Sequence, residues 1–580
     1  MSDGGIEHHD YDVLVLGSGG SGLRAAIAAA EAGARTGLVC KSLLGKAHTV
    51  MAEGGLAASL GNVAPEDNWA THFQDTMFGG KYLNNWRMAE LHAKEAPDRA
   101  RELEHWGAVF DRTPQRTMSQ RAFGGHTYKR LVHIGDRTGL EMIRTLHDKT
   151  VHSDVEVFME TTITRLIKDG ERVVGCFGYR RQTGELITFA AKALVLATGG
   201  SGRIYKITSN SQDCTGDGYA LAFEAGAQLV DMEFVQFHPT GMVYPPGVAG
   251  LLVTEAVRGE GGILRNKDGE RFMERYDPKR MELSTRDVVA RSIYTEVKEG
   301  RGTPHGGAYL DVSHLDPDYV KRKLPSMYDQ FLELAGVDIT KEPMQVGPTC
   351  HYFMGGVKVD PDTGATRVPG LFATGEASGG MNGANRLGGN SLGDILVFGR
   401  RAGEGAAATA NASGAVSLPA EAVADARAEI EGFLHGSGTE NPFHMHRELQ
   451  KIMGDGVGIF RDEEGLTEAI GKLEELDARV ANLRAPSDRL DYNPGLQLCR
   501  EVRNMLTVSH MIARAALLRE ESRGAHSRLD HTGYSDYWGE HNIIVEGTGA
   551  HDMSLTPTPV VKRDELEELV EARKEAEKAS

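Results

Sequence analysis

Cysteine is scarce in this sequence of 580 residues, and no Cys-x-x-Cys pair occurs. An odd number of cysteines without such a pair is typical of reduced, structural thiols, and we expect a cytoplasmic chain. Because iron–sulfur clusters are held by several cysteine thiolates, we expect no cluster here, and no metal site is predicted. The cysteines are Cys40, Cys176, Cys214, Cys350 and Cys499.

Long apolar runs are also missing, and residues 1–10 are polar and acidic. Since a spanning helix needs about 20 consecutive apolar residues, we expect neither a membrane span nor a signal peptide. Positive charge is in deficit, with 64 Lys and Arg against 82 Asp and Glu and a formal net charge of -18. Nucleic-acid binding requires clusters of Lys and Arg, so nucleic acid is excluded as a partner, and an anionic substrate would need a local cationic pocket.

The segment from Tyr11 to Gly22 reads Tyr-Asp-Val-Leu-Val-Leu-Gly-Ser-Gly-Gly-Ser-Gly, and an alanine-rich stretch follows it. This order predicts an apolar strand, a glycine-rich turn and a helix from Leu23 to about Ala32. At the N-terminus of such a helix, unpaired backbone N–H groups attract a pyrophosphate, and glycines allow its close approach. The predicted dinucleotide-binding residues of the turn are Gly17, Ser18, Gly19, Gly20, Ser21 and Gly22.

An acidic residue that would bind the ribose of NAD is absent at the end of the second predicted strand, residues 36–40. The strand runs into Lys41 and Ser42 instead, which weakens an NAD interpretation, although Ser42 could still bind a ribose hydroxyl. Two later apolar segments, residues 193–200 and 370–376, break at small residues, as strands that return to the same cofactor do. Ordinary buried parallel strands are the alternative for these two segments.

An ordered series of further motifs resembles the flavoprotein subunits of succinate dehydrogenases and fumarate reductases, the respiratory complex II family. The resemblance extends from about Tyr11 to about Asp530. One such match could arise by chance, whereas the ordered series does not. The segments that carry it are Ala47-His48-Thr49-Val50, Phe237-His238-Pro239-Thr240-Gly241, Thr254-Glu255-Ala-Val-Arg258-Gly-Glu-Gly-Gly262, Arg286-Asp-Val-Val-Ala-Arg291, His351-Tyr352-Phe-Met-Gly355-Gly356, Asn385-Arg386-Leu-Gly-Gly-Asn390-Ser391-Leu392 and Glu521-Ser-Arg-Gly-Ala-His-Ser-Arg528.

The resemblance implies an α/β fold with a discontinuous Rossmann-like FAD-binding domain, an inserted α+β capping domain and a C-terminal helical domain. In the last of these, the helical spacing of apolar residues predicts helices over residues 419–434, 444–453, 466–483 and 499–521. The expected boundaries are 1–232 and 349–410 for the FAD-binding domain, 233–348 for the capping domain, 411–540 for the helical domain and 541–580 for a C-terminal tail.

In the resembling family, the histidine that matches His48 is attached covalently to FAD, and the resemblance implies the same tether here. Such a tether withdraws electron density and raises the flavin potential, which succinate oxidation needs. Ser391 and Leu392 are expected to begin a helix whose N-terminus faces the flavin. The other cofactor-binding residues that the resemblance implies are Lys41, Ser42, Thr49, Gly54, Gly55, Asp217 and Glu376.

Removing two hydrogens from succinate requires a hydride acceptor, a proton acceptor and cations for two carboxylates. Arg386, which lies among glycines, offers a permanently charged planar fork that suits a carboxylate. By resemblance, the dicarboxylate is held by Arg386 together with His238, Thr254 and His351, and the ring of Phe123 covers it.

The resemblance assigns proton transfer to Arg286, with Glu255 and Arg258 as a relay toward solvent. Arginine is a very poor acid near neutral pH, so neighbouring cations would have to favour its neutral form. Without the family, an ion pair of Arg286 with Asp287 or Glu282 is the preferred interpretation.

Two segments depart from the family pattern. Fumarate reductases tend to carry glutamate at the position of Glu53, where succinate dehydrogenases tend to carry glutamine. A carboxylate there would disfavour reduced, anionic flavin, so Glu53 favours fumarate reduction or a low-potential quinone partner. Residues 124–130 also differ from the common form of the segment beside Phe123.

We therefore predict a peripheral flavoprotein subunit, at the cytoplasmic face of the inner (plasma) membrane, that interconverts succinate and fumarate. Its partners would be an iron–sulfur subunit and membrane anchor subunits with a quinone site. The alternatives are a menaquinol-linked fumarate reductase subunit, a soluble fumarate reductase or L-aspartate oxidase-like flavoenzyme, and a flavin-binding scaffold without dehydrogenase activity. His48 and residues 521–528 argue against the soluble enzymes, and the joint presence of Arg286, His238, His351 and Arg386 argues against the scaffold.

The end of the chain, from Lys562 to Lys578, alternates Glu and Lys and carries Leu566, Leu569 and Val570 on one side. A solvated terminal helix is the favoured interpretation, and a helix that docks on a partner is the alternative. No internal repeat is found.

Overall fold

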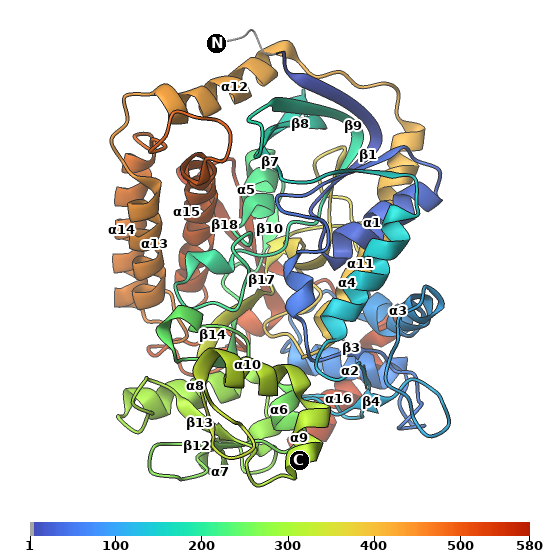
Figure 1. Cartoon of the computed structure of the whole chain (residues 1–580), viewed down its shortest axis with the longest axis vertical. Helices are drawn as coiled ribbons and strands as arrows, with labels where there is room; N and C mark the ends of the chain where they lie inside the picture. The colour runs from blue at the N-terminus through green and yellow to red at the C-terminus, as the bar shows by residue number, and fades with distance from the viewer. Residues whose placement is uncertain (1–4, 580) are drawn as a thin grey trace.

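The computed structural model describes residues 5–579 (Figure 1). Its largest sheet has the strand order β6-β2-β1-β9-β8-β7, and β16 pairs with β9. The segments predicted near residues 193–200 and 370–376 therefore contribute neighbouring parallel strands, although a long excursion of the chain separates them. The parallel strands are β1 (Glu7–Leu16), β2 (Thr36–Val39), β6 (Val155–Phe158), β9 (Leu186–Leu196) and β16 (Leu371–Ala373), and β7 (Thr161–Asp169) and β8 (Arg172–Arg180) are antiparallel.

Helix α1 (Gly20–Glu31) follows β1 and begins at Gly20 rather than at the predicted Leu23. The strand–turn–helix order is confirmed, and the earlier start reflects glycines that join the first helical turn. A Cβ on Gly22 would lie 1.8 Å from the carbonyl oxygen of Gly17, so the turn closes only with glycine at this position. α1 packs along α11 (Asn390–Ala412), where a Cβ on Gly403 would lie 2.2 Å from a backbone oxygen of α1.

Residues between β10 (Leu229–Val230) and β16 include a second, antiparallel sheet with the order β11-β14-β13-β12, which lies at the bottom of Figure 1. Apolar side chains on this sheet and on its helices form a core of their own. The sheet contains β11 (Val235–Met242), β12 (Ile263–Arg265), β13 (Ala308–Asp311) and β14 (Met344–Phe353), and the helices are α6 (Ala256–Gly259), α7 (Met273–Tyr276), α8 (Arg286–Lys298), α9 (Pro317–Lys323) and α10 (Pro325–Ala335).

Four helices follow α11 and confirm the four helical segments predicted after residue 411. Their apolar faces pack together and also cover part of the large sheet's core. α15 begins earlier than predicted because Pro494 occupies its first position and the Asn493 side chain accepts a hydrogen bond from Leu496 N. The helices are α12 (Ala420–His435), α13 (Pro442–Gly456), α14 (Glu463–Val480) and α15 (Pro494–Leu518).

The C-terminal stretch is folded back onto the molecule. β17 (His541–Glu546) and β18 (Ser554–Pro559) extend a sheet that contains β10 and β15 (Gly356–Val357). The last helix, α16 (Glu567–Ala579), lies beside α2 (Trp69–Gly79) (Figure 1).

The interpretation of the last helix as solvated is wrong. Leu566 and Val570 are buried, and they join one cluster with Phe73 and Met77 of α2. The apolar stripe predicted from the sequence is real, but the same chain covers it.

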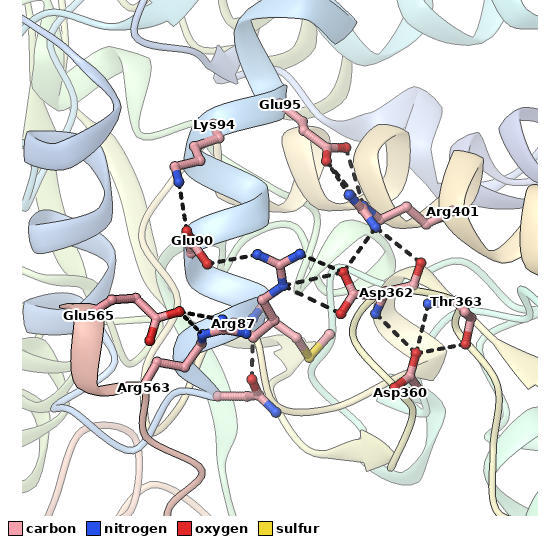
Figure 2. A network of polar contacts seen from close by, with 12 residues as sticks. Arg87, Glu90, Lys94, Glu95, Asp360, Asp362, Thr363, Arg401, Arg563 and Glu565 are labelled. Carbon is pink, nitrogen blue, oxygen red and sulfur yellow. Dashed lines mark hydrogen bonds and ion pairs between the residues drawn. The ribbon is translucent and has the colours of Figure 1, made fainter.

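Figure 2 shows a polar network that joins three segments at the surface. Arg87, in α3 (Trp86–His105), pairs with Glu90 at 2.9 Å and with Asp362 at 2.7 Å. Arg401 of α11 donates to the Asp362 carbonyl at 3.0 Å. Because Arg87, Asp362 and Arg401 are partly exposed, each pair contributes little by itself, and the network chiefly fixes the turn around Asp362.

Shorter elements complete the fold around the large sheet. Within residues 5–579, none of the helices combines the length and apolar character that crossing a bilayer requires. All five cysteines are buried free thiols, as predicted. The remaining elements that the site uses are the short helix η1 (His48–Met51), β3 (Leu56–Ala57), β4 (Gln120–Arg121), β5 (Leu131–Val132), α4 (Thr138–Val151) and α5 (Asp217–Glu224).

The tight turn after β1 gives a test of the fold. Gly22→Ala would place a methyl group against the Gly17 carbonyl, and overpacking of this kind costs about 1–3 kcal/mol. We expect a lower midpoint of thermal unfolding by circular dichroism. As a control, Gly471→Ala in α14 meets open space in an exposed helix and should stabilise the chain slightly, by up to about 1 kcal/mol. Equal midpoints for the two variants would contradict this account of the turn.

Candidate active site

A cavity opens at the carboxyl ends of β1, β2 and β9 and reaches the second sheet. The turn after β1, residues 47–55 and the start of α11 form one side of its wall, while β11 and α8 contribute to the other. Every site residue predicted from the sequence lines this cavity except Gly20, Gly22 and Arg258. The predicted residues, though widely scattered over the printed sequence, thus converge on one place.

The glycine turn closes one end of the cavity. Gly17 has a φ of +110°, and a Cβ there would lie 2.3 Å from the Ala197 carbonyl oxygen. A larger residue would therefore force β1 and β9 apart. Gly20 donates its N–H to Thr49 Oγ1 at 3.2 Å, and Gly22 packs on Gly17, so both shape the turn without lining the cavity.

Lys41 and Asp217 line the cavity as an ion pair. The Lys41 ammonium lies 2.7 Å from an Asp217 carboxylate oxygen and 2.7 Å from Glu501 of α15. Burial alone would lower the pKa of Lys41, but these two carboxylates outweigh it and raise that pKa above its usual value. Asn504 of the same helix donates to Asp217 at 2.8 Å, so the C-terminal helices brace this end of the cavity.

His48 lies in η1 on the cavity wall. Its Nε2 is 3.3 Å from Asn210 Nδ2, and its buried Nδ1 has no hydrogen-bond partner within residues 5–579. Burial, reinforced by the positive charge of Arg386, lowers the pKa of His48 to about 4. The imidazole is therefore neutral at physiological pH and retains an unshared electron pair.

Glu53 also lines the cavity, and its side chain is buried. Burial raises the pKa of this carboxyl well above its usual value, and the nearby Asp136 adds to the effect. Its Oε2 accepts no hydrogen bond from the described part of the chain. Burial therefore disfavours the ionised form of the Glu53 carboxyl.

Two guanidinium groups lie close together at the end of the cavity away from the glycine turn. Arg386 Nη2 donates to Gln236 Oε1 at 3.0 Å, and Arg286 Nη1 approaches the same oxygen at 3.3 Å. Arg386 also lies over the ring of Tyr352, 4.1 Å from its centroid. Burial and the charge of Arg286 lower the pKa of Arg386 to about 9, so it remains cationic near neutral pH.

His238, His351 and Thr254 lie beside these cations. The two imidazole rings are 5.1 Å apart, and burial lowers the pKa of both well below the usual value. His238 Nε2 lies 3.1 Å from the Val253 carbonyl oxygen, so the neutral ring donates its one N–H to that oxygen. To donate this N–H to a ligand in the cavity, the His238 ring would have to rotate. His351 Nδ1 contacts Ser209 at 2.8 Å, and a proton on its Nε2 can be donated elsewhere.

Glu255 is bound to the cationic pair. Its Oε2 accepts from Arg286 Nε at 2.8 Å, and its Oε1 accepts from Gly124 N at 2.9 Å. Burial would raise the pKa of Glu255, but Arg258 and Arg286 outweigh it and hold that pKa below its usual value. Arg258 Nη2 lies 3.5 Å from Glu255 behind the cavity wall. The alternative partners of Arg286, Asp287 and Glu282, form ion pairs with other residues.

The ring of Phe123 is buried between two glycines. A Cβ on Gly54 would lie 2.6 Å from this ring, and one on Gly388 would lie 2.4 Å from it. The glycines therefore make room for an aromatic side chain at the cationic end of the cavity.

The first turn of α11 borders the cavity with Ser391 and Leu392. Ser391 Oγ accepts from Arg386 Nη1 at 2.8 Å. Glu376, from the turn after β16, accepts from Phe353 N at 3.0 Å, and burial raises its pKa to about 7. The N-terminal end of a long helix thus faces the cavity together with a carboxyl group that titrates near neutral pH.

Several residues that line the cavity or contact its lining residues escaped the sequence prediction. Gln236 and Glu501 are ordinary polar residues whose importance appears only from the cations that they contact. Tyr352 carried a signal, because it follows His351 directly in one of the quoted motifs. Thr161, Thr162 and Ile163 line the wall at the start of β7, which follows the edge strand β6.

Two family models match the chain, the FAD binding domain over residues 12–392 and the fumarate reductase flavoprotein C-terminal domain over residues 446–573. Among the relatives, one subunit of the fumarate reductase (CoM/CoB) of Methanothermobacter marburgensis is 48% identical over 525 residues, covering 90% of this chain and 95% of the relative. The succinate dehydrogenase flavoprotein subunit of Coxiella burnetii is 39% identical and covers 96% of this chain and 100% of the relative.

Solved structures agree with these relatives. The Mycobacterium smegmatis Sdh1 complex in the apo form contains a chain that is 52% identical, with coverage of 99% of this chain and 98% of that one and a TM-score of 0.88. FrdA of the Escherichia coli quinol fumarate reductase is 35% identical, with coverage of 96% and 98% and a TM-score of 0.91. This chain therefore belongs to the family of succinate dehydrogenase and fumarate reductase flavoprotein subunits, which are FAD-dependent oxidoreductases.

Proposed function

We propose that this chain interconverts succinate and fumarate as the flavoprotein subunit of a complex II-type enzyme. The observation that carries the proposal is the cationic end of the cavity, where Arg286 and Arg386 share the Gln236 side-chain oxygen. Within residues 5–579, Glu255 is the one carboxylate bonded to these two buried guanidinium groups, and this balance of charge favours a dianionic ligand. A four-carbon dicarboxylate supplies two negative charges at the spacing that two such groups can bind.

Substrate recognition would use groups with free donors near this pair. The Nε of Arg386 is buried and has no partner in the described structure, so a carboxylate can satisfy it. Thr254 Oγ1 accepts from Ala256 N at 3.3 Å and therefore keeps its own proton to donate. His351 offers a second donor, while the ring of Phe123 would exclude water from the bound dicarboxylate.

Proton transfer would use Arg286, Glu255 and Arg258. Arg286 lies on the cavity wall, and its Nε proton is already shared with Glu255. Glu255 continues the chain toward Arg258 on the far side of the wall. Glu255 can accept the proton from Arg286 and hold it on its way to solvent.

FAD fits the residues on the other side of the cavity. Orphaned buried groups, including His48 Nδ1 and Thr198 Oγ1, point to a polar ligand, since within residues 5–579 these atoms make no hydrogen bond. The turn at Gly17 and Gly19, the first turn of α11 and Glu376 would hold the dinucleotide and the flavin ring. When bound, FAD supplies hydride acceptance and passes the electrons on.

A covalent tether through His48 is part of the proposal. Attachment requires a neutral imidazole with an unshared electron pair, and burial supplies it by lowering the pKa of His48 to about 4. The position of His48 on the cavity wall and its unpartnered Nδ1, which meets no donor or acceptor in the described chain, support the tether.

The partners would be an iron–sulfur subunit and membrane anchor subunits with a quinone site, and the chain would lie at the cytoplasmic face of the inner membrane. Support comes from the relatives, several of which are named as subunits of larger enzymes. Electrons that leave the flavin need a further redox centre, and an iron–sulfur subunit would provide it.

The direction of the reaction does not follow from Glu53. Burial disfavours the negative charge on Glu53 that could oppose a reduced flavin, which weakens the electrostatic argument for fumarate reduction. We propose succinate oxidation coupled to quinone reduction as the function, with menaquinol-linked fumarate reduction as the alternative.

The substrate proposal is tested by turnover. The holoenzyme should reduce an artificial electron acceptor with succinate, and Arg386→Gln should lower kcat/KM by a factor of about 10³ or more, because it removes a charge-assisted contact made in the transition state. Arg367→Gln removes an exposed pair with Glu546 and a hydrogen bond to the Gly226 carbonyl, neither of them in the cavity wall, so this matched control should be unaffected. Activity with L-aspartate but none with succinate or fumarate would reject the proposal.

The tether is tested by acid precipitation of the chain from its native host. Yellow flavin should remain in the pellet, and His48→Ala should release it to the supernatant while non-covalent FAD still binds in the folded protein. His147→Ala changes a partly exposed histidine of α4 and serves as the control. Flavin released from the unaltered chain would reject the tether but leave the dicarboxylate proposal intact.

The charge state of Glu53 gives a pH prediction. Since the folded pKa lies above the unfolded one, Glu53 binds its proton more tightly in the folded chain. This contribution to stability is complete below the unfolded pKa and is lost as pH rises through the folded pKa. Glu53→Gln has no titrating carboxyl and so does not lose stability in this way. The difference in free energy of unfolding between Glu53→Gln and the unaltered chain should therefore shift in favour of the variant from pH 5 to pH 9, by up to about 1.4 kcal/mol per pH unit. Midpoints of thermal unfolding measure this trend. A constant difference would show that Glu53 is ionised in the folded chain.

A further inference from the structure

The loop of residues 123–130, between β4 and β5, forms the cover of the cationic end of the cavity. Phe123 fills the space between Gly54 and Gly388, and Gly124 N donates to Glu255 at 2.9 Å. This loop therefore reaches both the proposed dicarboxylate position and the proposed proton relay. Its conformation decides whether that end of the cavity is closed.

The far side of the loop is bound to α2 through Asp75. Thr127 donates its N–H to Asp75 Oδ2 at 2.7 Å and its hydroxyl to Asp75 Oδ1 at 2.6 Å. Asp75 is completely buried, so its charge needs cationic partners. Arg130, at the end of the same loop, supplies one at 3.0 Å.

The second cation comes from the last helix of the chain. Arg573 of α16 lies 3.2 Å from Asp75 Oδ1, and its other terminal nitrogen is 3.4 Å from Thr127 Oγ1. The Arg573 guanidinium also lies over the ring of Phe78. A second guanidinium, that of Arg280 before α8, lies 5.0 Å from the centroid of the same ring. Arg573 is therefore the point at which the C-terminal helix, α2 and the cover loop meet.

α16 is fixed firmly enough to transmit this contact. Leu566 and Val570 are buried beside α2, and Gln74 donates to the Leu569 carbonyl at 2.8 Å. The Tyr82 hydroxyl also bonds Glu577 near the end of the helix. These contacts hold the backbone of α16, whereas Arg573 connects the helix to the loop.

We propose that α16 positions the substrate cover, with Arg573 acting through Asp75 and Thr127 to hold the Phe123 loop closed over the dicarboxylate. This inference rests on the proposed function for the identity of the ligand. Without Arg573, Asp75 keeps one cationic partner, and the loop opens more readily. Substrate binding must then order the loop, which weakens apparent affinity while the reacting groups keep their places.

The experiment uses the holoenzyme with Arg573→Met, which keeps the aliphatic stem but removes the guanidinium. We expect the KM for succinate to rise about 3- to 10-fold with kcat changed less than about twofold, and the Thr127 amide to exchange its hydrogen faster by a similar factor. Arg573→Lys should restore part of both effects, because an ammonium can still pair with Asp75.

Two further variants separate positioning from loosening of the helix. Gln74→Met removes a bond that fastens α16 but leaves the loop contacts, and it should change neither KM nor the exchange of Thr127. Thr127→Val keeps α16 docked while removing the hydroxyl that Asp75 and Arg573 both contact, and it should raise KM.

An unchanged KM together with unchanged exchange of Thr127 in Arg573→Met would overturn the positioning role. Equal effects of Gln74→Met and Arg573→Met would also overturn it, because they would show only a loosened helix. Hydrogen exchange at Thr127 does not depend on the substrate. An enzyme that is inactive with succinate, yet shows faster exchange in Arg573→Met, would reject the proposed function and retain the link from α16 to the loop.

Discussion

The structure around the cavity depends on two buried guanidinium groups that are held close together. Burying like charges is costly, and the chain offsets the cost with the Gln236 oxygen, the Glu255 carboxylate and the face of the Tyr352 ring. Arg286 belongs to α8, whereas Arg386 precedes α11. The two charges therefore come from different segments of the chain, and both can stay buried only where these segments meet.

Burial also decides which other groups of the cavity carry charge. It lowers the pKa of His48 to about 4 and the pKa of His351 well below its usual value, so both rings are neutral. It raises the pKa of Glu53 well above its usual value and that of Glu376 to about 7. In the described part of the chain, the charged groups bonded together at the cationic end are guanidinium groups and the Glu255 carboxylate, a combination that favours a dianion over a cation.

The sequence predicted the local patterns well and the long-range contacts poorly. The strand–turn–helix at Gly17 and the four helices after residue 411 follow from glycine spacing and apolar periodicity, which act within a few residues. The bond between Gln236 and Arg386 joins positions far apart in the chain, and periodicity carries no information about it. For the same reason, the apolar stripe of the last helix was predicted correctly, while α2, which buries it, was not.

The C-terminal part of the chain supports the cavity at both ends, which explains why the site needs nearly the whole sequence. Glu501 of α15 balances Lys41 at the dinucleotide end, and Arg573 of α16 pairs with the buried Asp75 beside the cover loop. Undocking the final helices would leave Lys41 with Asp217 and Asp75 with Arg130, so each charge would lose one of its two partners. Docking of these helices is thus coupled to the cavity's charge balance. A ligand that binds only the assembled cavity must therefore stabilise elements far from its own contacts.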